Sequence, residues 1–405
     1  MAKRILIYTN HFFPENFKVN EVAHLLAEEG NLIHVITQTP NYPSGNFYKG
    51  YGIFKKSFER INSNLTVKRL PVIPRGSGSK FELVLNYLSF FLSTFFYTLH
   101  LAFFIKKYDV VFVHHTSPAL ITLCPILYKG IKSSKIILWD LDMWPDTLVA
   151  LGLITNKRLE LFLEKKMTWI YRQYNLILLG SKGFFHKANH RVGSAKVEYF
   201  PNWAEQVFHK NQPFSEIYEF PESQNFKLVY AGNLGEAQDL ENVFKAIELL
   251  KNHPITWIFI GDGRFKANFY DLLISSNLLS KVVFLGNHPI EKMPYFFSKS
   301  DAMFLSLKKS DIFRLTVPAK LQAYMAAGKP VIGMLSGEGG EIIKESNCGF
   351  VSESGDFRGF AKNVLDLISL SEKEREVLGK NGKDFYNRIF SFGKRKDQLK
   401  RIVNI

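Results

Sequence analysis

The sequence predicts an α/β protein made of two Rossmann-like domains, each with a parallel sheet. Short apolar, β-branched runs alternate with helix-like segments through both halves of the 405 residues. Strands separated by helices of about 10–15 residues form βαβ units, and such units build parallel sheets. We place the first domain over residues 1–203 and the second over 204–388. A basic C-terminal helix is predicted over residues 389–405, with the option of packing back on the first domain.

The predicted strands follow one another in the same pattern along each half. In the first half they are RILIYT (4–9), LIHVIT (32–37), VKRLPV (67–72), DVVFVH (109–114), KIILWD (135–140) and LILLGS (176–181). In the second half they are KLVYAG (227–232), TWIFIG (256–261), KVVFLG (281–286), AMFLSL (302–307), PVIGML (330–335) and GFVSE (349–353). Residues 198–226, rich in Pro, Asn and Gln, are the predicted linker. Since open parallel sheets bind ligands at the carboxyl ends of their strands, we expect the active site in a cleft between the domains.

The composition excludes several classes of protein. Hydrophobic residues make up 46% of the chain, an ordinary share for a globular protein and too small for a protein with many membrane spans. Cys124 and Cys348 form neither a disulfide framework nor a metal-ligand set, which suits a reducing cytosol. The apolar run at the N-terminus is too short for a signal peptide, so we expect the protein on the cytoplasmic side of the membrane.

The net charge of +15 is concentrated in the first half of the chain. Residues 1–200 hold 25 Lys and Arg against 13 Asp and Glu, whereas the remainder holds 27 against 24. The imbalance predicts an anionic partner for the first domain, such as lipid head groups or a pyrophosphate, and a general effect on solubility is the alternative. Nucleic acid is not among the expected partners, because no nucleic-acid-binding module is recognisable in the sequence.

Residues 83–105 form a long apolar segment with no acidic or basic residue apart from His100. About 20 apolar residues can span a bilayer, but a span would separate two strands that belong to one sheet. On a helix, polar residues from Asn86 to His100 form one narrow stripe, and apolar residues that include Phe91 and Phe95 lie opposite. The flanking cations favour a monotopic helix in the interface of anionic inner-leaflet lipid over an oligomer contact or burial in protein.

A glycine motif in the second half is a candidate phosphate site. In FIGDGRFK (259–266), a strand ends at Gly261-Asp262-Gly263, and Arg264 and Lys266 open the next helix. Glycines permit close backbone approach, and free N–H groups at a helix N-terminus together with cations bind phosphate. The sequence GDG is also a common turn, and this alternative stays open.

A second candidate lies in residues 316–351. Pro318 and Lys320 begin a predicted helix, and a glycine-rich loop with Glu338 and Glu341 follows the next strand. A positive side chain in the first turn of a helix is unfavourable unless an anion is near, so Lys320 indicates a bound anion. Either glutamate is suitably placed to bind ribose hydroxyls, and an acid that merely begins a helix is the alternative.

Several segments resemble one family of enzymes. The motifs YMAAGKPVIG (324–333), GDGRFK (261–266) and VYAGNLGEAQDLENVFKAI (229–247) resemble the donor-binding domain of family-four retaining glycosyltransferases, which have the GT-B fold. PVIPRGSGS (71–79) and LWDLDMWPDTLVALG (138–152) are similar to bacterial transferases of O-antigen and capsule assembly, many of them N-acetyl-L-fucosamine transferases. The resemblance covers roughly residues 1–390.

The chain departs from this family at positions that commonly hold the donor. After the first glycine of the second domain, Gly232, members commonly carry an Arg and, five residues later, a Lys; Asn233 and Gln238 stand there instead. Members also carry two glutamates eight residues apart, and Leu315 and Ala323 occupy those positions here. The resemblance therefore implies that other residues bind the pyrophosphate and the ribose.

We predict that cations bind the phosphates, that Glu338 or Glu341 binds the ribose, and that Asp311 replaces the first missing glutamate. The residues predicted to bind the donor are Gly232, Asn233, Gly235, Gly261, Asp262, Gly263, Lys266, Asp311, Pro318, Glu338, Gly339, Gly340 and Glu341. The residues predicted to act in catalysis are Lys18, Asp142, His115, Arg264 and Lys320. No metal ligands and no cofactor are expected, because no His, Cys, Asp or Glu cluster has ligand spacing.

Loops that follow strands of the first domain are candidates for the acceptor site. Lys18 follows the first strand and is expected to meet the pyrophosphate, and one of two adjacent histidines is expected to face the ligand. Trp144 offers a stacking face, and Asp142 a hydrogen bond to a hydroxyl. The residues predicted to bind the acceptor are Glu15, Asn16, Asn41, Tyr42, His114 and Trp144.

The resemblance implies a retaining, metal-independent glycosyltransferase that is peripheral on the inner face of the cell membrane. It would move a sugar, such as N-acetyl-L-fucosamine or a related N-acetylated hexosamine, from a UDP-sugar to a polyprenyl-diphosphate-linked saccharide. In the mechanism implied, the leaving phosphate takes the proton of the attacking hydroxyl, and the protein contributes positioning and charge. A nucleotide-sugar epimerase of GT-B-like fold is the alternative, although it needs neither an acceptor nor an apolar surface helix.

Overall fold

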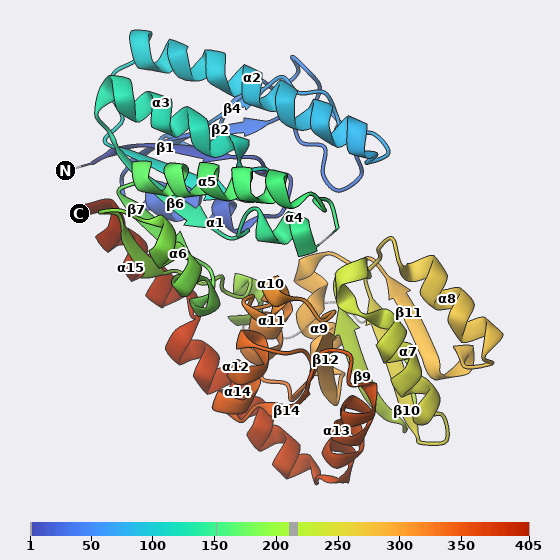
Figure 1. The fold of residues 1–405 in the computed structure, drawn as a ribbon. Coiled ribbons are helices and arrows are strands. Elements are labelled where there is room, and N and C mark those ends of the chain that lie inside the picture. Colours follow the sequence, from blue (N-terminus) through green and yellow to red (C-terminus); the bar gives the residue numbers. More distant parts are fainter. Residues whose placement is uncertain (1, 151, 210–217, 405) are drawn as a thin grey trace. The chain divides into compact units, whose positions relative to one another are not determined.

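The computed structural model describes residues 2–150, 152–209 and 218–404. The chain divides into two compact units, the first comprising Met1–Phe200 with Lys396–Ile405 and the second Pro201–Arg395. Each unit is a parallel-stranded sheet with helices packed on it, so the predicted α/β fold with two parallel sheets is confirmed (Figure 1). Residues 210–217 of the predicted linker lie outside the described residues.

The sheet of unit 1 has the strand order β3-β4-β2-β1-β5-β6-β7-β8. The strands are β1 (Arg4–Thr9), β2 (Leu32–Gln38), β3 (Phe58–Arg60), β4 (Leu65–Leu70), β5 (Val110–His115), β6 (Lys135–Asp140), β7 (Leu176–Leu179) and β8 (Lys196–Tyr199). Only β3 pairs antiparallel, with β4, among the strands described for this unit. All six residues of β5 are buried, which is why central strands of a parallel sheet appear in sequence as continuous apolar runs.

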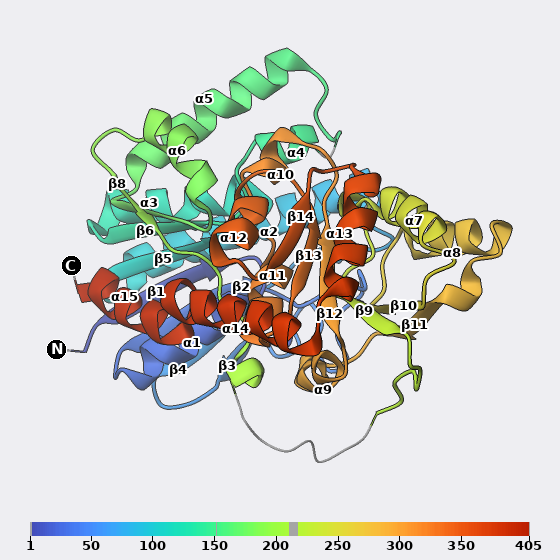
Figure 2. The same cartoon turned by 90° about the horizontal axis from the view of Figure 1, so that it is seen from below.

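Helices cover both faces of this sheet. The connections β4–β5, β5–β6 and β6–β7 run across the sheet in one direction and β1–β2 in the other. Since such crossovers are right-handed, α2 (Lys80–Phe104), α3 (Leu123–Lys132) and α5 (Lys157–Gln173) share one face, and α1 (Lys18–Glu28) lies on the other. The helix α15 (Phe392–Asn404) runs beside α1, where Lys396 and Lys400 pair with Glu29 at 3.3 and 2.9 Å (Figure 2).

The sheet of unit 2 is parallel throughout, in the order β11-β10-β9-β12-β13-β14. Its strands are β9 (Phe226–Ala231), β10 (Ile255–Ile260), β11 (Val282–Gly286), β12 (Ala302–Ser306), β13 (Val331–Met334) and β14 (Gly349–Ser352). The helices are α7 (Leu240–Leu249), α8 (Lys266–Ser275), α9 (Met293–Ser298), α10 (Asp311–Arg314), α11 (Ala319–Ala326), α12 (Glu338–Ser346), α13 (Phe357–Ser369) and α14 (Glu372–Ile389). Aromatic rings fill the core, with Trp257, Phe304 and Phe360 in mutual contact.

All twelve predicted strands are present, and two short ones were not predicted. These are β3, which is an edge strand, and β8, which begins just before the predicted linker and ends inside it. The strand predicted over 67–72 is found two residues earlier, because Pro71 has no N–H to continue the ladder. The predicted glycine loop at Gly339 and Gly340 is instead the first turn of α12, where both residues are buried.

The helix α2 coincides with the apolar segment singled out in the sequence. Ser79 caps its start, in a reciprocal arrangement of hydrogen bonds with Glu82. The polar stripe faces the protein: Asn86 donates to the Ile73 carbonyl, Ser93 donates to the Pro71 carbonyl at 2.8 Å, and Tyr97 bonds to His34 at 3.2 Å. The helix is long and apolar enough to cross a membrane, although a single helix of this kind is weak evidence for a span.

Candidate active site

Two loops at the carboxyl ends of β9 and β10 pack directly on each other. The Gly232 N–H donates to the Ile260 carbonyl at 2.8 Å, and the Leu234 N–H to the Asp262 carbonyl at 2.9 Å. A Cβ at Gly261 would lie 2.2 Å from the Gly232 oxygen, and one at Gly263 would lie 2.4 Å from the Leu234 oxygen. The contact between the loops therefore requires both glycines of the GDG motif, whether or not a ligand is bound.

Lys320 occupies the space above the first of these loops. A Cβ at Gly232 would lie only 2.4 Å from Lys320 Cε, so the lack of a side chain at this glycine makes room for the lysine. The Nζ donates to Gln238 Oε1 at 3.1 Å and lies 4.9 Å from the centre of the Tyr230 ring. Burial lowers the pKa of Lys320 from 10.5 to about 8.

The position of Lys320 is related to the places where this sequence departs from the glycosyltransferase family. Gln238 stands where family members commonly have a lysine, and the Lys320 ammonium reaches that position from α11. No carboxylate pairs with Lys320 among the described residues. A partly buried ammonium without a counter-ion, beside the carboxyl end of a strand, is suited to a bound anion.

The other predicted phosphate ligands of unit 2 lie on the adjacent loop. Arg264 is exposed and precedes α8, which begins at Lys266 rather than at Arg264. Lys266 lies 3.8 Å from Asp262, on the same turn of chain. Both cations thus extend from the loop that packs against Gly232, and Arg264 has no carboxylate partner within the described ranges.

The candidate carboxylates differ in their surroundings. Glu338 is half-buried in the first turn of α12, beside Gly339, whose Cβ would lie 3.0 Å from Pro318 at the start of α11. Glu341 is exposed, pairs with Lys344 at 3.0 Å and lines a separate hollow toward α13. Asp311 is exposed at the first residue of α10. Of the two glutamates, Glu338 is therefore the one beside the start of α11, the helix that carries Lys320.

In unit 1, Glu15 stabilises the loop that follows β2. Its carboxylate accepts the backbone N–H groups of Asn41 and Tyr42 at 2.8 and 2.7 Å and lies 2.6 Å from His11 Nδ1. Glu15 and Asn41 are fully buried, and the Asn41 side chain donates to the Thr39 carbonyl. The Glu15 carboxylate and the Asn41 side-chain nitrogen are thus already bonded within the protein, whereas Asn41 Oδ1 is buried without a partner among the described residues and Tyr42 is exposed.

Arg75 was not predicted as a site residue, but it lies beside this loop. Its Nη2 is 3.3 Å from His11 Nε2, and the guanidinium lies over the rings of Tyr42 and Tyr87 at 5.2 and 5.5 Å. Arg75 has no carboxylate partner in the part of the chain that the structure describes. In the sequence it stood out only through its place in the PVIPRGSGS motif and as one of the cations that flank the apolar segment.

Two more residues of the HFFPENFKVNE segment have different environments. Lys18, the first residue of α1, is largely buried and pairs with Glu21 at 3.0 Å, so part of its charge is already neutralised. Asn16 is exposed.

The two adjacent histidines are both buried, and they differ in their contacts. His114 Nδ1 lies 3.0 Å from Thr9 Oγ1, and burial lowers the pKa of His114 to about 3. His115 Nδ1 lies 2.6 Å from Asp140 Oδ1, and Asp140 also accepts a hydrogen bond from the Tyr171 hydroxyl. The other ring nitrogen of His115, Nε2, is buried without a hydrogen-bond partner in the described ranges. This nitrogen is therefore the one available to a ligand.

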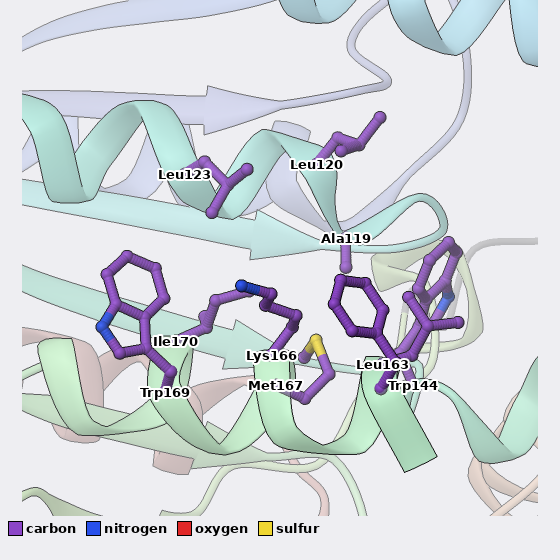
Figure 3. Close-up of a pocket in the computed structure, with 10 residues that line it drawn as sticks. Ala119, Leu120, Leu123, Trp144, Leu163, Lys166, Met167, Trp169 and Ile170 are labelled. Carbon is purple, nitrogen blue, oxygen red and sulfur yellow. The ribbon is translucent and has the colours of Figure 1, made fainter. Parts of the chain in front are cut away.

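A further polar group lies at the carboxyl end of β6. The Ser117 hydroxyl donates to Asp142 and accepts from Trp144 Nε1 at 2.7 Å. Trp144 also forms one end of an apolar cavity between α3 and α5 (Figure 3). Asp142 and Trp144 are thus held together by Ser117, which the sequence did not single out.

Metal ligands do not gather at any of these places. Within residues 2–150, 152–209 and 218–404, no group of three or more His, Cys, Asp or Glu side chains is arranged to hold a metal ion.

Comparisons with known proteins find glycosyltransferases among the similar sequences and folds. Residues 212–385 match the family model of the group 1 glycosyl transferases. A probable glycosyltransferase of Pseudomonas aeruginosa, WbjE, is 25% identical over 76% of this chain and 79% of its own length. A candidate colanic acid biosynthesis glycosyl transferase of Escherichia coli K12, WcaI, is 23% identical over 80% of this chain and 81% of its own.

Solved structures show the same fold. Sucrose-phosphate synthase of Thermosynechococcus elongatus aligns over 100% of this chain and 98% of its own, with a TM-score of 0.72 and 13% identity. HepE of Anabaena, solved with UDP and glucose, aligns over the full length of both chains with a TM-score of 0.70 and 14% identity. None of these proteins is named as an epimerase, the alternative considered from the sequence. Residues 212–385 therefore resemble the group 1 glycosyl transferases in sequence, and the fold, with its two parallel sheets, is that of GT-B glycosyltransferase structures.

Proposed function

We propose that this protein is a glycosyltransferase that transfers a sugar, with retention, from a UDP-sugar to a polyprenyl-diphosphate-linked saccharide in O-antigen or capsule synthesis. The observation that carries the donor assignment is Lys320, a partly buried ammonium without a counter-ion beside the glycine loop of β9. HepE, with the same fold, was solved with UDP, and WcaI is named for colanic acid biosynthesis, which supports the choice of donor and pathway class.

The donor diphosphate is assigned to the cations of unit 2. Lys320 supplies a partly buried charge, and Arg264 and Lys266 supply further charge from the packed loop. Glu338, in the first turn of α12, is the preferred ligand for ribose hydroxyls. Charge held in place before the reaction lowers the barrier, because the diphosphate leaves with more negative charge than it carries in the substrate.

The chemical step needs no nucleophile from the protein. The acceptor hydroxyl oxygen forms a bond to the anomeric carbon while the bond from that carbon to the β-phosphate oxygen breaks on the same face. The hydroxyl proton passes to that phosphate oxygen, so UDP leaves with it. We assign to His115 a hydrogen bond between Nε2 and a hydroxyl of the transferred sugar, since Asp140 holds the ring at Nδ1.

The acceptor is assigned to the carboxyl ends of the unit 1 strands. Asp142 accepts a hydrogen bond from a saccharide hydroxyl, and Arg75 and Lys18 supply further positive charge beside the loops of this unit. The transferred sugar is proposed to be an N-acetylated hexosamine such as N-acetyl-L-fucosamine, on the strength of the sequence resemblance alone.

The helix α2 is proposed to hold the enzyme on the inner face of the membrane. Its polar stripe is bonded to the protein, and apolar residues cover the outer face: Phe81, Val84, Leu88, Leu92, Phe96, Phe103 and Phe104 are exposed. Phe91 and Phe95, predicted opposite the polar stripe, are only half-exposed, and Ala102 is buried. A surface helix in water would carry charges there, whereas a lipid interface accepts this face.

The test is a UDP-release assay with a panel of UDP-sugars, with and without a polyprenyl-diphosphate-linked saccharide. Transfer predicts UDP release that requires the acceptor, together with a glycosylated lipid product whose anomeric configuration matches that of the donor. Release or sugar inversion without the acceptor would instead support an epimerase and refute the proposal.

A further inference from the structure

An apolar groove crosses the surface of unit 1 between α5 and the start of α3. Its volume is about 450 Å³, within the range of small-molecule sites. The walls include Ala119, Leu123, Trp144, Leu163, Met167 and Trp169. Figure 3 shows Trp169 at one end and Trp144 at the other, with Met167 and Lys166 between them. The groove is therefore elongated along α5 and has an indole at each end.

Large apolar side chains of α5 line this groove yet remain open to solvent. Phe162 is 53% exposed and Trp169 is 48% exposed. Helices on a protein surface place polar side chains outward, and contiguous apolar surface marks a binding site. The pattern of α5 thus indicates a ligand with a long apolar portion.

One end of the groove reaches the polar group at the carboxyl end of β6. Trp144 lines the groove and donates from Nε1 to Ser117, and Ser117 donates to Asp142. Open parallel sheets bind substrates at this edge. A ligand that fills the groove therefore presents its nearer end to the position where the acceptor is proposed to react.

The charges of α5 indicate the sign of the ligand. Its two acids are occupied: Glu160 pairs with Lys157 at 2.7 Å, and Glu164 pairs with Arg191 at 2.6 Å. Lys166, the one charged residue in the groove wall, lies over the Phe162 ring at 5.2 Å and pairs with no carboxylate in the described part of the chain. An apolar groove with an unpaired ammonium fits an amphiphile that carries a negative charge.

We propose that the groove holds the isoprenoid chain of the lipid-linked acceptor, with Lys166 meeting its diphosphate. The isoprenoid runs toward Trp169, and the saccharide extends past Trp144 toward Asp142. The identity of the ligand rests on the proposed function, whereas its chemical class, an anionic isoprenoid, rests on the groove. An acyl chain of a membrane lipid is the competing occupant, but it has no reason to end at the reacting edge of the sheet.

The first experiment measures binding of farnesyl phosphate to the full-length protein through tryptophan fluorescence, since Trp144 and Trp169 line the groove. The neighbours Phe162 and Leu161 make a matched pair of variants, because both are 53% exposed and only Phe162 lines the groove. We expect Phe162→Asp to raise the Kd at least tenfold and Leu161→Asp to leave it within twofold. Both changes are at exposed positions, so neither removes a buried side chain.

The second experiment compares acceptors. Phe162→Asp should raise the KM for a polyprenyl-linked acceptor at least tenfold and leave transfer to a water-soluble acceptor analogue unchanged. Equal effects of the two variants, or no binding of farnesyl phosphate to the wild-type protein, would overturn the groove assignment. Tighter binding of dihexanoyl phosphatidylglycerol than of farnesyl phosphate would also overturn it, in favour of a membrane lipid.

The two proposals fail separately. Loss of the groove assignment with acceptor-dependent transfer intact leaves the proposed function standing. Farnesyl phosphate binding with the expected variant pattern, in a protein that transfers no sugar to any lipid-linked acceptor, would refute the proposed function and retain the groove.

Discussion

Replacing Lys320 with methionine separates the binding of the donor from the stability of the fold. The Nζ contacts Gln238 Oε1 and the Tyr230 ring, and burial lowers its pKa from 10.5 to about 8. A shift of this size corresponds to about 3 kcal/mol against the charged form in the ligand-free protein. We therefore expect Lys320→Met to keep or raise the melting temperature at pH 7, because methionine fills similar space without a partly buried charge.

The same change should weaken the binding of UDP. One charge-assisted contact contributes about 1.5–3 kcal/mol, so the Kd should rise roughly 10- to 150-fold. Isothermal titration gives the Kd directly, and the upward shift of the melting temperature with UDP should shrink in parallel. Lys251→Met is the control, because Lys251 is exposed just before β10, at the opposite edge of the same sheet.

The pH dependence of UDP affinity gives an independent check. Folding lowers the pKa of Lys320, so the penalty for its charge is full below pH 8 and disappears as pH rises from 8 toward 10.5. In the wild-type protein, UDP affinity should fall above about pH 8 as the ammonium loses its proton. Lys320→Arg should remove this decline, since guanidinium stays charged. Unchanged UDP affinity in Lys320→Met, or the same decline with pH in Lys320→Arg, would refute the assignment.

Three further outcomes are expected. Glu338→Ala should raise the Kd for UDP about tenfold and Glu341→Ala should not, because Glu341 pairs with Lys344 on the other side of α12; the reverse order in a UDP titration would exchange their roles. Dialysis against EDTA should leave transfer intact, since cationic side chains are assigned to the diphosphate, and activity that magnesium or manganese restores would contradict this. The double variant Leu92→Ser/Phe96→Ser should release the protein from anionic vesicles in a flotation assay while UDP binding persists, because these side chains are 52% and 65% exposed. Loss of UDP binding as well would mean that α2 is needed for folding.

The sequence by itself determined the class of fold, because strands buried on both faces of a parallel sheet must be apolar along their whole length. All twelve runs of this kind are strands in the structure. The two strands that were missed, β3 and β8, carry half-exposed polar residues near the edges of the sheet, so no apolar run marks them. The capped start of α2 at Ser79, which we did not predict, is also local, because Ser79 and Glu82 are three residues apart.

The sequence also pointed to Lys320, because a cation in the first turn of a helix opposes the helix dipole. Its surroundings were decided only by the tertiary structure, which brings Gly232 and Gln238 to it from about 80 residues away in the chain. The GDG glycines likewise looked like ligand contacts in sequence, and the structure explains them by the packing of two loops.

Only the tertiary structure decided which face of α2 is open and which polar residues remain available. The helical pattern separated a polar stripe from an apolar face, but hydrogen bonds to Ile73 and Pro71 turn the polar stripe inward. Glu15 appeared to be an acceptor ligand until two backbone N–H groups from the loop after β2 were found on its carboxylate. A residue type states which bonds a side chain can make, whereas the long-range contacts of the fold decide which of those bonds are already made.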